Sequence, residues 1–101
     1  MILNIYKPST WTSFDVVKKI KIITKEKKVG HGGTLDPFAE GVLIIGTNID
    51  TKKLSNISRC NKTYNATIKL GIHTDSFDRD GKIMKTNEVP ILDEVIIKSV
   101  L

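Results

Sequence analysis

The sequence has few of the features that mark secreted or membrane proteins. Cys60 is the only cysteine, so no internal disulfide can form and a reducing compartment is expected. No apolar run approaches the roughly 18 residues that span a membrane, and residues 1–6 lack the basic start and the long apolar centre of a signal peptide. We therefore expect a soluble, cytoplasmic protein with no membrane partner.

Spacings typical of metal sites and nucleophilic triads are also missing. His31, His73 and Cys60 lack zinc-type spacing, and no Ser-His-Asp or Cys-His set is evident. The acidic segment 73–82 fails two ligand positions of a calcium-binding loop, so a polar hairpin turn is favoured there. The glycine-rich segment 30–36 lacks the Gly-Lys-Ser/Thr ending of a phosphate-binding loop. We expect neither a metal nor a cofactor.

What the sequence does have is a localised positive charge. Residues 1–35 contain seven lysines and only two acidic residues, Asp15 and Glu26, whereas residues 36–101 carry nine basic and nine acidic side chains. The whole net charge of +5 therefore lies in the first third of the chain. Such a patch favours a polyanionic partner, with nucleic acid first among them. A lysine-rich helix face that is merely solvated is the alternative.

The first third predicts a strand followed by a helix. Residues 1–7 mix Ile, Leu and Tyr with polar residues as strands do, and Pro8 ends the run. Thr12 and Asp15 have capping-box spacing at the start of an amphipathic helix over about 13–24. The apolar side of this helix would carry Val16, Ile20 and Ile23.

Shorter elements follow in the middle of the chain. We expect residues 25–33 to form a loop and residues 42–46 a buried strand, while residues 51–59 are compatible with either a helix or a loop. Residues 62–72 alternate apolar and polar side chains, which predicts a half-buried antiparallel strand. Length and composition suit one globular domain.

The last third predicts a hairpin and a helix. The polar segment 73–82 reads as a long turn that leads into a return strand at 83–86. Residues 90–101 place apolar side chains at helical spacing, without a glycine cap or a basic last turn. A helix that stops in mid-pattern indicates that a continuation is missing.

The segment "GHGGTLDPFAEG", residues 30–41, holds the strongest candidate site. Asp36 precedes Pro37, and this pair suits the start of a short helical turn that Asp36 would simply cap. The glycines just before it favour more than a cap, because glycine permits positive φ or the close approach of a ligand at an entropic cost. From the residues alone, a cap and a functional carboxylate both stay open.

A longer segment, "KVGHGGTLDPFAEGVL", resembles the Gly-His-x-Gly-x-Leu-Asp-Pro signature of the TruB family, the bacterial tRNA pseudouridine synthases that act on the T-loop uridine at position 55. Upstream, "YKPSTWTSFDVVKKI" is similar to the family's Lys-Pro-x-Gly-x-Thr-Ser motif and helix. Downstream, "KTYNATIKLGIHTDSFDRDGKI" is similar to its Lys-x-Tyr-x-Ala strand and acidic turn. The resemblance implies an α+β fold with a mixed, mainly antiparallel sheet and flanking helices, an incomplete pseudouridine synthase catalytic fold.

The resemblance also implies an isomerase that binds the T-arm of tRNA. Asp36 would be the catalytic residue, as a lone carboxylate needs no metal or cofactor to help break a base–sugar bond. Tyr64 would stack on the flipped base, although its place in an alternating segment is equally typical of a core tyrosine. The other implied substrate-binding residues are His31 beside the nucleotide, Lys7 on a phosphate, and Gly32 and Gly33 close to the RNA.

Several positions and the length depart from the family pattern. The unusual residues are Thr10 and Asn48 where Gly is common, Glu40 where Thr is common, Ile44 where Pro is common, and Asp50 where Ala is common. Residues 1–101 resemble only the N-terminal portion of the catalytic domain, without the later part that supplies an Arg and a second Tyr, or the C-terminal RNA-binding domain. We therefore expect a truncated chain with weak or absent activity. Whether a separate C-terminal chain completes the site stays open.

Two other functions are compatible with the residues. The chain would be a non-catalytic RNA-binding remnant if Asp36 did no chemistry. An acid-dependent hydrolase built on Asp36 would need a second carboxylate, for which Glu40 is the only local candidate.

Overall fold

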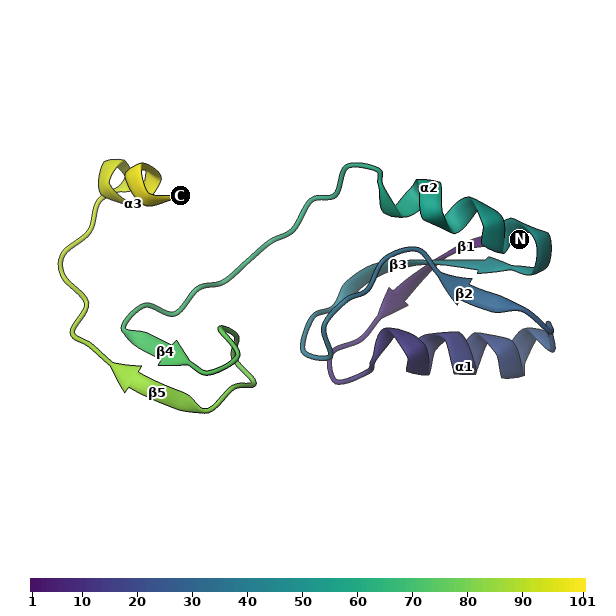
Figure 1. Ribbon diagram of the computed structural model, residues 1–101, viewed down its shortest axis with the longest axis horizontal. Coiled ribbons are helices and arrows are strands. Elements are labelled where there is room, and N and C mark those ends of the chain that lie inside the picture. The colour runs from purple at the N-terminus through teal and green to yellow at the C-terminus, as the bar shows by residue number, and fades with distance from the viewer. The chain divides into compact units, whose positions relative to one another are not determined.

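The computed structural model describes residues 1–101 and divides into two compact units, Met1–Thr63 and Tyr64–Leu101 (Figure 1). This differs from the single globular domain that length and composition suggest. The reason is that every buried residue lies in the first unit, so the second has no core of its own. The combination of helices with strands that all pair in antiparallel fashion confirms the α+β class. None of the helices has the length and apolar character needed to cross a membrane.

The first unit is built around a three-stranded sheet of order β1-β3-β2. Its elements are β1 (Ile2–Lys7), α1 (Ser13–Thr24), β2 (Val29–His31), β3 (Gly41–Thr47), the 3₁₀ helix η1 (Asn48–Lys53) and α2 (Leu54–Ser58). β3 pairs with β1 along its whole length, with Ile5 opposite Leu43, and with β2 at its end, with His31 opposite Ile45. The predicted strands at 1–7 and 42–46 are thereby confirmed.

One face of this sheet is covered by α1, and the two together form the core. Val16 and Val17 from α1 pack against Leu43 and Ile45 from β3, all of them at most 7% exposed. On the opposite side of the sheet, Leu54 at the start of α2 is buried against glycines of β2 and β3. The face toward α1 is thus buried at Leu43 and Ile45, whereas the opposite face is covered at Gly46 and leaves Val42 67% exposed.

Helix α1 begins and ends as its sequence predicts. The Thr12 side chain accepts from the Asp15 N–H and the Asp15 carboxylate accepts from the Thr12 N–H, which completes the capping box. Ile23, expected on the buried side, is 64% exposed instead. The buried residues of the helix are Ser13, Val16 and Val17, and Ile23 is exposed like the helix lysines.

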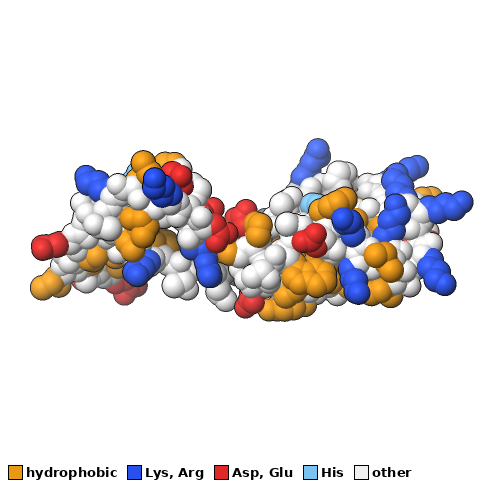
Figure 2. Space-filling view, turned by 90° about the horizontal axis from the view of Figure 1, so that it is seen from below, with side chains coloured by type: hydrophobic (Ala, Val, Ile, Leu, Met, Phe, Trp, Pro, Cys, Tyr) orange, Lys and Arg blue, Asp and Glu red, His pale blue; other side chains and the backbone are white.

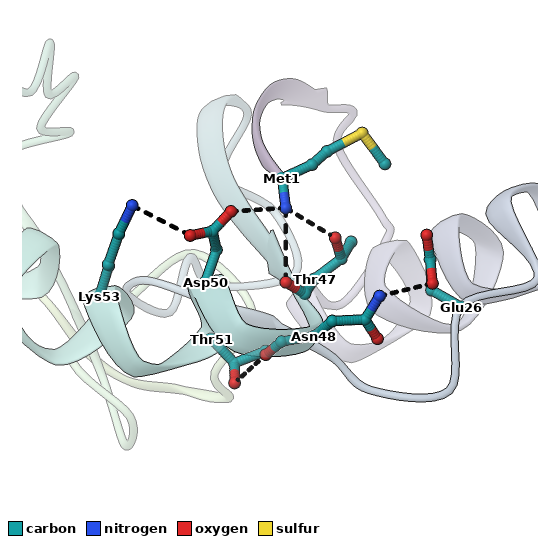
Figure 3. A network of polar contacts seen from close by, with 7 residues as sticks. All are labelled: Met1, Glu26, Thr47, Asn48, Asp50, Thr51 and Lys53. Atoms are coloured by element: carbon teal, nitrogen blue, oxygen red, sulfur yellow. Dashed lines mark hydrogen bonds and ion pairs between the residues drawn. The ribbon is translucent and has the colours of Figure 1, made fainter.

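A polar network ties the start of β1 to the end of β3 (Figure 3). The α-ammonium group of Met1 lies 2.6 Å from the Asp50 carboxylate and donates to the Thr47 hydroxyl at 3.0 Å. The same carboxylate pairs with Lys53 at 3.0 Å. The Met1 ammonium and then Lys53 hold the pKa of Asp50 below its ordinary value by hydrogen bonding. Asp50, unusual for the family pattern, thus has a structural role here.

Two further expectations for this unit are settled by the structure. The prediction of a loop throughout residues 25–33 is wrong for Val29–His31, which pairs with β3. With the sequence Val-Gly-His, β2 is too short to show an alternation of apolar and polar side chains. Only its pairing with β3 defines it as a strand. Residues 51–59, compatible with helix or loop, continue η1 and form α2.

The second unit contains a two-stranded hairpin, β4 (Ile72–Thr74) with β5 (Ile83–Thr86), and the helix α3 (Glu94–Val100). The polar turn, the return strand and the C-terminal helix are therefore confirmed. The predicted strand at 62–72 is wrong, because residues 61–71 adopt no regular strand structure. Alternating residues form a strand only when a neighbouring strand accepts their backbone hydrogen bonds, and no strand of the structure pairs with this segment.

Candidate active site

Asp36 lies in the loop that joins β2 to β3, with its carboxylate exposed. The turn that follows is closed by the backbone, since the Ala39 N–H donates to the Asp36 carbonyl at 3.0 Å. The carboxylate itself makes no hydrogen bond or ion pair, so it does not cap the turn. Both carboxylate oxygens of Asp36 are therefore available to interact with a ligand.

The backbone around Asp36 is nevertheless held firmly to the segment between β1 and α1. The Ser13 hydroxyl accepts from the Leu35 N–H at 3.0 Å and donates to the Leu35 carbonyl at 3.2 Å. The Thr10 N–H donates to the Pro37 carbonyl at 2.6 Å. The Ser9 hydroxyl donates to the Phe38 carbonyl at 3.0 Å.

These contacts bracket Asp36 from both sides in the chain. Its two neighbours, Leu35 and Pro37, are each bound to a residue that precedes or begins α1. The loop therefore presents an unpartnered carboxylate from a fixed backbone. Such preorganisation is what a catalytic or ligand-binding group requires. Ser9 and Ser13 were not singled out from the sequence, although both belong to the segment "YKPSTWTS" that matches a family motif.

Lys7 contributes to the same scaffold, and its expected contact with a phosphate is not what the structure displays. The side chain is 0% exposed. Its ammonium group donates to the carbonyls of Trp11 at 2.5 Å, Pro8 at 3.0 Å and Pro37 at 3.3 Å. All three ammonium donors are thus used inside the protein. The cause is register, since Lys7 continues the inward alternation of Leu3 and Ile5 along β1.

The two glycines before Asp36 differ in whether the structure requires glycine at their positions. Gly33 has φ +115°, a conformation that other residues rarely adopt. Gly32 has ordinary φ, and a Cβ there would make ordinary van der Waals contact with Leu54 at 3.4 Å, so neither backbone nor packing requires glycine. The predicted closeness of Gly32 and Gly33 to RNA stays a prediction.

His31 stands at the end of β2 and is half-buried. Its Nδ1 lies 2.9 Å from the Gly33 carbonyl, which makes Nδ1 the protonated nitrogen in the neutral ring and leaves Nε2 as an acceptor. The structure thus places His31 in the same loop region as Asp36 with one ring nitrogen unused. Its role toward a nucleotide stays a prediction.

Tyr64 lies in the second unit, at its first residue. Its side chain is 66% exposed and belongs to no strand, so the alternative of a core tyrosine is wrong. Tyr64 therefore belongs to the second unit and Asp36 to the first, and the role of Tyr64 toward the base stays a prediction.

Tyr6 and Glu40 form a pair that the sequence did not predict. A hydrogen bond to Glu40, followed by partial burial and the negative charge of Glu40, raises the pKa of Tyr6. No group of three or more His, Cys, Asp or Glu side chains lies close enough together to hold a metal ion.

Comparison with known proteins agrees with the motifs around Asp36. Residues 21–101 match the family described as TruB family pseudouridylate synthase (N terminal domain). A tRNA pseudouridine synthase B from Clostridium acetobutylicum is 49% identical over 100 residues, which is 99% of this chain and 35% of that protein. The namesake from Clostridium novyi is 53% identical over 95 residues, or 93% of this chain and 33% of the relative.

A relative from a second bacterial genus gives the same result. The tRNA pseudouridine synthase B of Ureaplasma urealyticum is 50% identical over 95 residues, covering 93% of this chain and 42% of that protein. The chain spans about a third of the length of the clostridial relatives that it matches. It belongs to the TruB family of pseudouridylate synthases.

Proposed function

We propose that this chain carries the catalytic aspartate of a tRNA pseudouridine synthase that isomerises the T-loop uridine at position 55. The observation that carries the proposal is the Asp36 carboxylate, which is exposed and unpartnered, while the backbone on both sides of it is bound to Thr10 and Ser13. The relatives' names supply the reaction class, and the family signature around Asp36 supplies the position.

The reaction needs little besides a well-placed acid. The bond from uracil N1 to ribose C1′ breaks, the base turns, and a bond forms from C5 to C1′. C5 loses a proton and N1 gains one, so the formula is unchanged and no redox step occurs. A carboxylate next to the flipped nucleotide assists by attacking the sugar or the base, or by accepting a sugar proton.

The surrounding residues have roles that follow from their positions. His31 offers Nε2 to a nucleotide that enters the loop, since Nδ1 is occupied by the Gly33 carbonyl. Tyr64 supplies an exposed aromatic face for base stacking. Lys7 acts as a positioning residue through the Pro37 carbonyl rather than as a phosphate ligand. Residues 1–101 constitute the N-terminal portion of the catalytic domain in this proposal.

The test compares Asp36→Asn with the same substitution at a second exposed aspartate outside the site. Because the chain covers about a third of its relatives, activity is best measured in a chimera in which residues 1–101 replace the matching part of the Clostridium acetobutylicum synthase. Asp36→Asn removes the charge and keeps the size. We expect a loss of at least about 10²–10⁴-fold in turnover of a T-arm hairpin, with the affinity for RNA retained.

Asp80→Asn is the control, because Asp80 is also exposed but lies in the β4–β5 turn. It should leave turnover unchanged. Pseudouridine is quantified after nuclease digestion of the RNA. Full turnover by the Asp36→Asn chimera would contradict the proposal and leave the chain as a non-catalytic RNA-binding member of the family.

A further inference from the structure

The outer face of α1 carries a row of lysines that the proposed chemistry does not use. Lys18 and Lys21 lie three residues apart on one side of the helix, and Lys25 follows at its C-cap, in the left-handed conformation. All three side chains are exposed. Lys19, Lys27 and Lys28 flank this row and are exposed as well. We refer to Lys18, Lys21 and Lys25 as the lysine row.

No ion pair involves the lysine row. The ion pairs of the structure join Met1 and Lys53 to Asp50, and Lys98 to Glu94. The nearest acids in sequence have other work, since Asp15 closes the capping box. Glu26 accepts a hydrogen bond from Asn48 at 2.6 Å. Asp15 lies close enough to Lys18 for that charge to contribute to its lowered pKa, whereas Lys21 and Lys25 take part in no ion pair, so positive charge predominates on this face.

Aromatic and apolar side chains lie between the lysines. Phe14 is 63% exposed, and the Lys18 Nζ lies 5.5 Å from the centre of its ring. Two shallow depressions of about 420 and 380 Å³ flank the row, and the first includes Trp11. Figure 2 views this side of the first unit, with blue lysines spread around orange hydrophobic side chains. Cations with interleaved aromatic faces suit a nucleic-acid backbone.

The position of the row relative to Asp36 selects the ligand. Helix α1 starts at Ser13, which binds Leu35 in the Asp36 loop, and then runs away from that loop (Figure 1). At about 1.5 Å per residue, Lys18 lies about 8 Å and Lys25 about 18 Å along the helix axis from Ser13. The row thus spans about 10 Å, and a strand rising about 3.4 Å per nucleotide covers that length with roughly three phosphates.

We infer that the lysine row binds the phosphate backbone of the RNA stem that carries the modified loop, while the loop itself occupies the Asp36 region. This inference rests on the proposed function. It assigns to the lysine row the contacts with phosphates outside the reacting nucleotide. Lys7, expected from the sequence to contact a phosphate, is buried and does not take this role.

The experiment measures the salt dependence of binding. A fluorescent T-arm hairpin with its full stem is titrated with the 101-residue chain and with Lys18→Gln/Lys21→Gln/Lys25→Gln, at several salt concentrations. We expect the triple variant to bind at least tenfold more weakly at low salt. The slope of log affinity against log salt should fall by about two to three, one unit for each lost phosphate contact.

Lys69→Gln/Lys82→Gln/Lys85→Gln is the matched control. It removes the same charge from exposed lysines of the second unit. We expect it to change the slope by less than one unit. An equal effect of both triple variants would mean that only net charge matters and would overturn the inference.

A second measurement separates this inference from the proposed function. In the chimera, the lysine-row variant should raise KM for the hairpin and leave kcat unchanged, whereas Asp36→Asn lowers kcat. If the chimera makes pseudouridine and the lysine-row variant changes neither KM nor the salt slope, the inference fails and the proposed function stands. A variant that lowers the unfolding temperature of the chimera without changing RNA affinity would show that protein covers this face, and would also overturn it.

Discussion

Thr10 is held in a backbone conformation that glycine tolerates and threonine does not. Its φ is 76°, where a β-branched side chain is a true outlier. Such strain costs about 1–3 kcal/mol, whereas glycine gives back about 0.4–1 kcal/mol through the greater freedom of the unfolded chain. The Thr10 side chain is exposed and makes no hydrogen bond, so little packing is lost on its removal. Thr10→Gly should therefore stabilise the protein by about 0.5–2 kcal/mol.

The substitution keeps the N–H that donates to the Pro37 carbonyl, so the Asp36 loop stays attached. For a unit of this size, about 1 kcal/mol corresponds to roughly 4–8 °C in the unfolding temperature. Thermal unfolding by circular dichroism measures the change. Asn48→Gly is the comparison, because Asn48 also has positive φ, 52°, but asparagine adopts it readily. A Thr10→Gly protein no more stable than the parent, or a gain no larger than that of Asn48→Gly, would refute the reasoning.

Three further outcomes follow from the same scaffold. Lys7→Met should destabilise the protein by about 1–3 kcal/mol because buried carbonyls lose their donor, as measured by urea unfolding. Ser13→Ala should cost about 1–2 kcal/mol and also lower the turnover of the chimera, since Leu35 loses both of its bonds. The pKa of Asp50 is lowered by the Met1 ammonium and by Lys53, so its stabilising effect is complete above about pH 4 and is lost as the pH falls through its lower folded value. Asp50→Asn should flatten that acid limb of a stability–pH curve, and an unchanged limb would contradict the assignment.

The parts of the fold that were predicted correctly are those governed by neighbours in sequence. The capping box of α1 joins residues three apart, and the β4–β5 turn is closed by its own polar residues. The strand predicted over residues 62–72 was wrong because it depends on residues distant in sequence. Their alternation is compatible with a strand, but strand formation depends on a partner that no nearby residue can provide.

The candidate site divides in the same way. Asp36 and its loop were recognisable from the motif, because the glycines, the aspartate and the proline are contiguous. The bonds from Ser9, Thr10 and Ser13 to this loop span more than 20 residues and could not be seen in the sequence. They also explain why the loop is more than a flexible connection.

The sequence by itself determined the family, the helix α1, the strands β1 and β3, and the position of the single acid in its glycine-rich loop. It did so because periodicity, capping and motif order act over short distances along the chain. Only the tertiary structure decided that Lys7 turns inward to three carbonyls, that the Asp36 carboxylate is left without a partner, and that the lysines of α1 face outward unpaired. Burial and pairing depend on residues that folding brings together, so no local pattern could determine them.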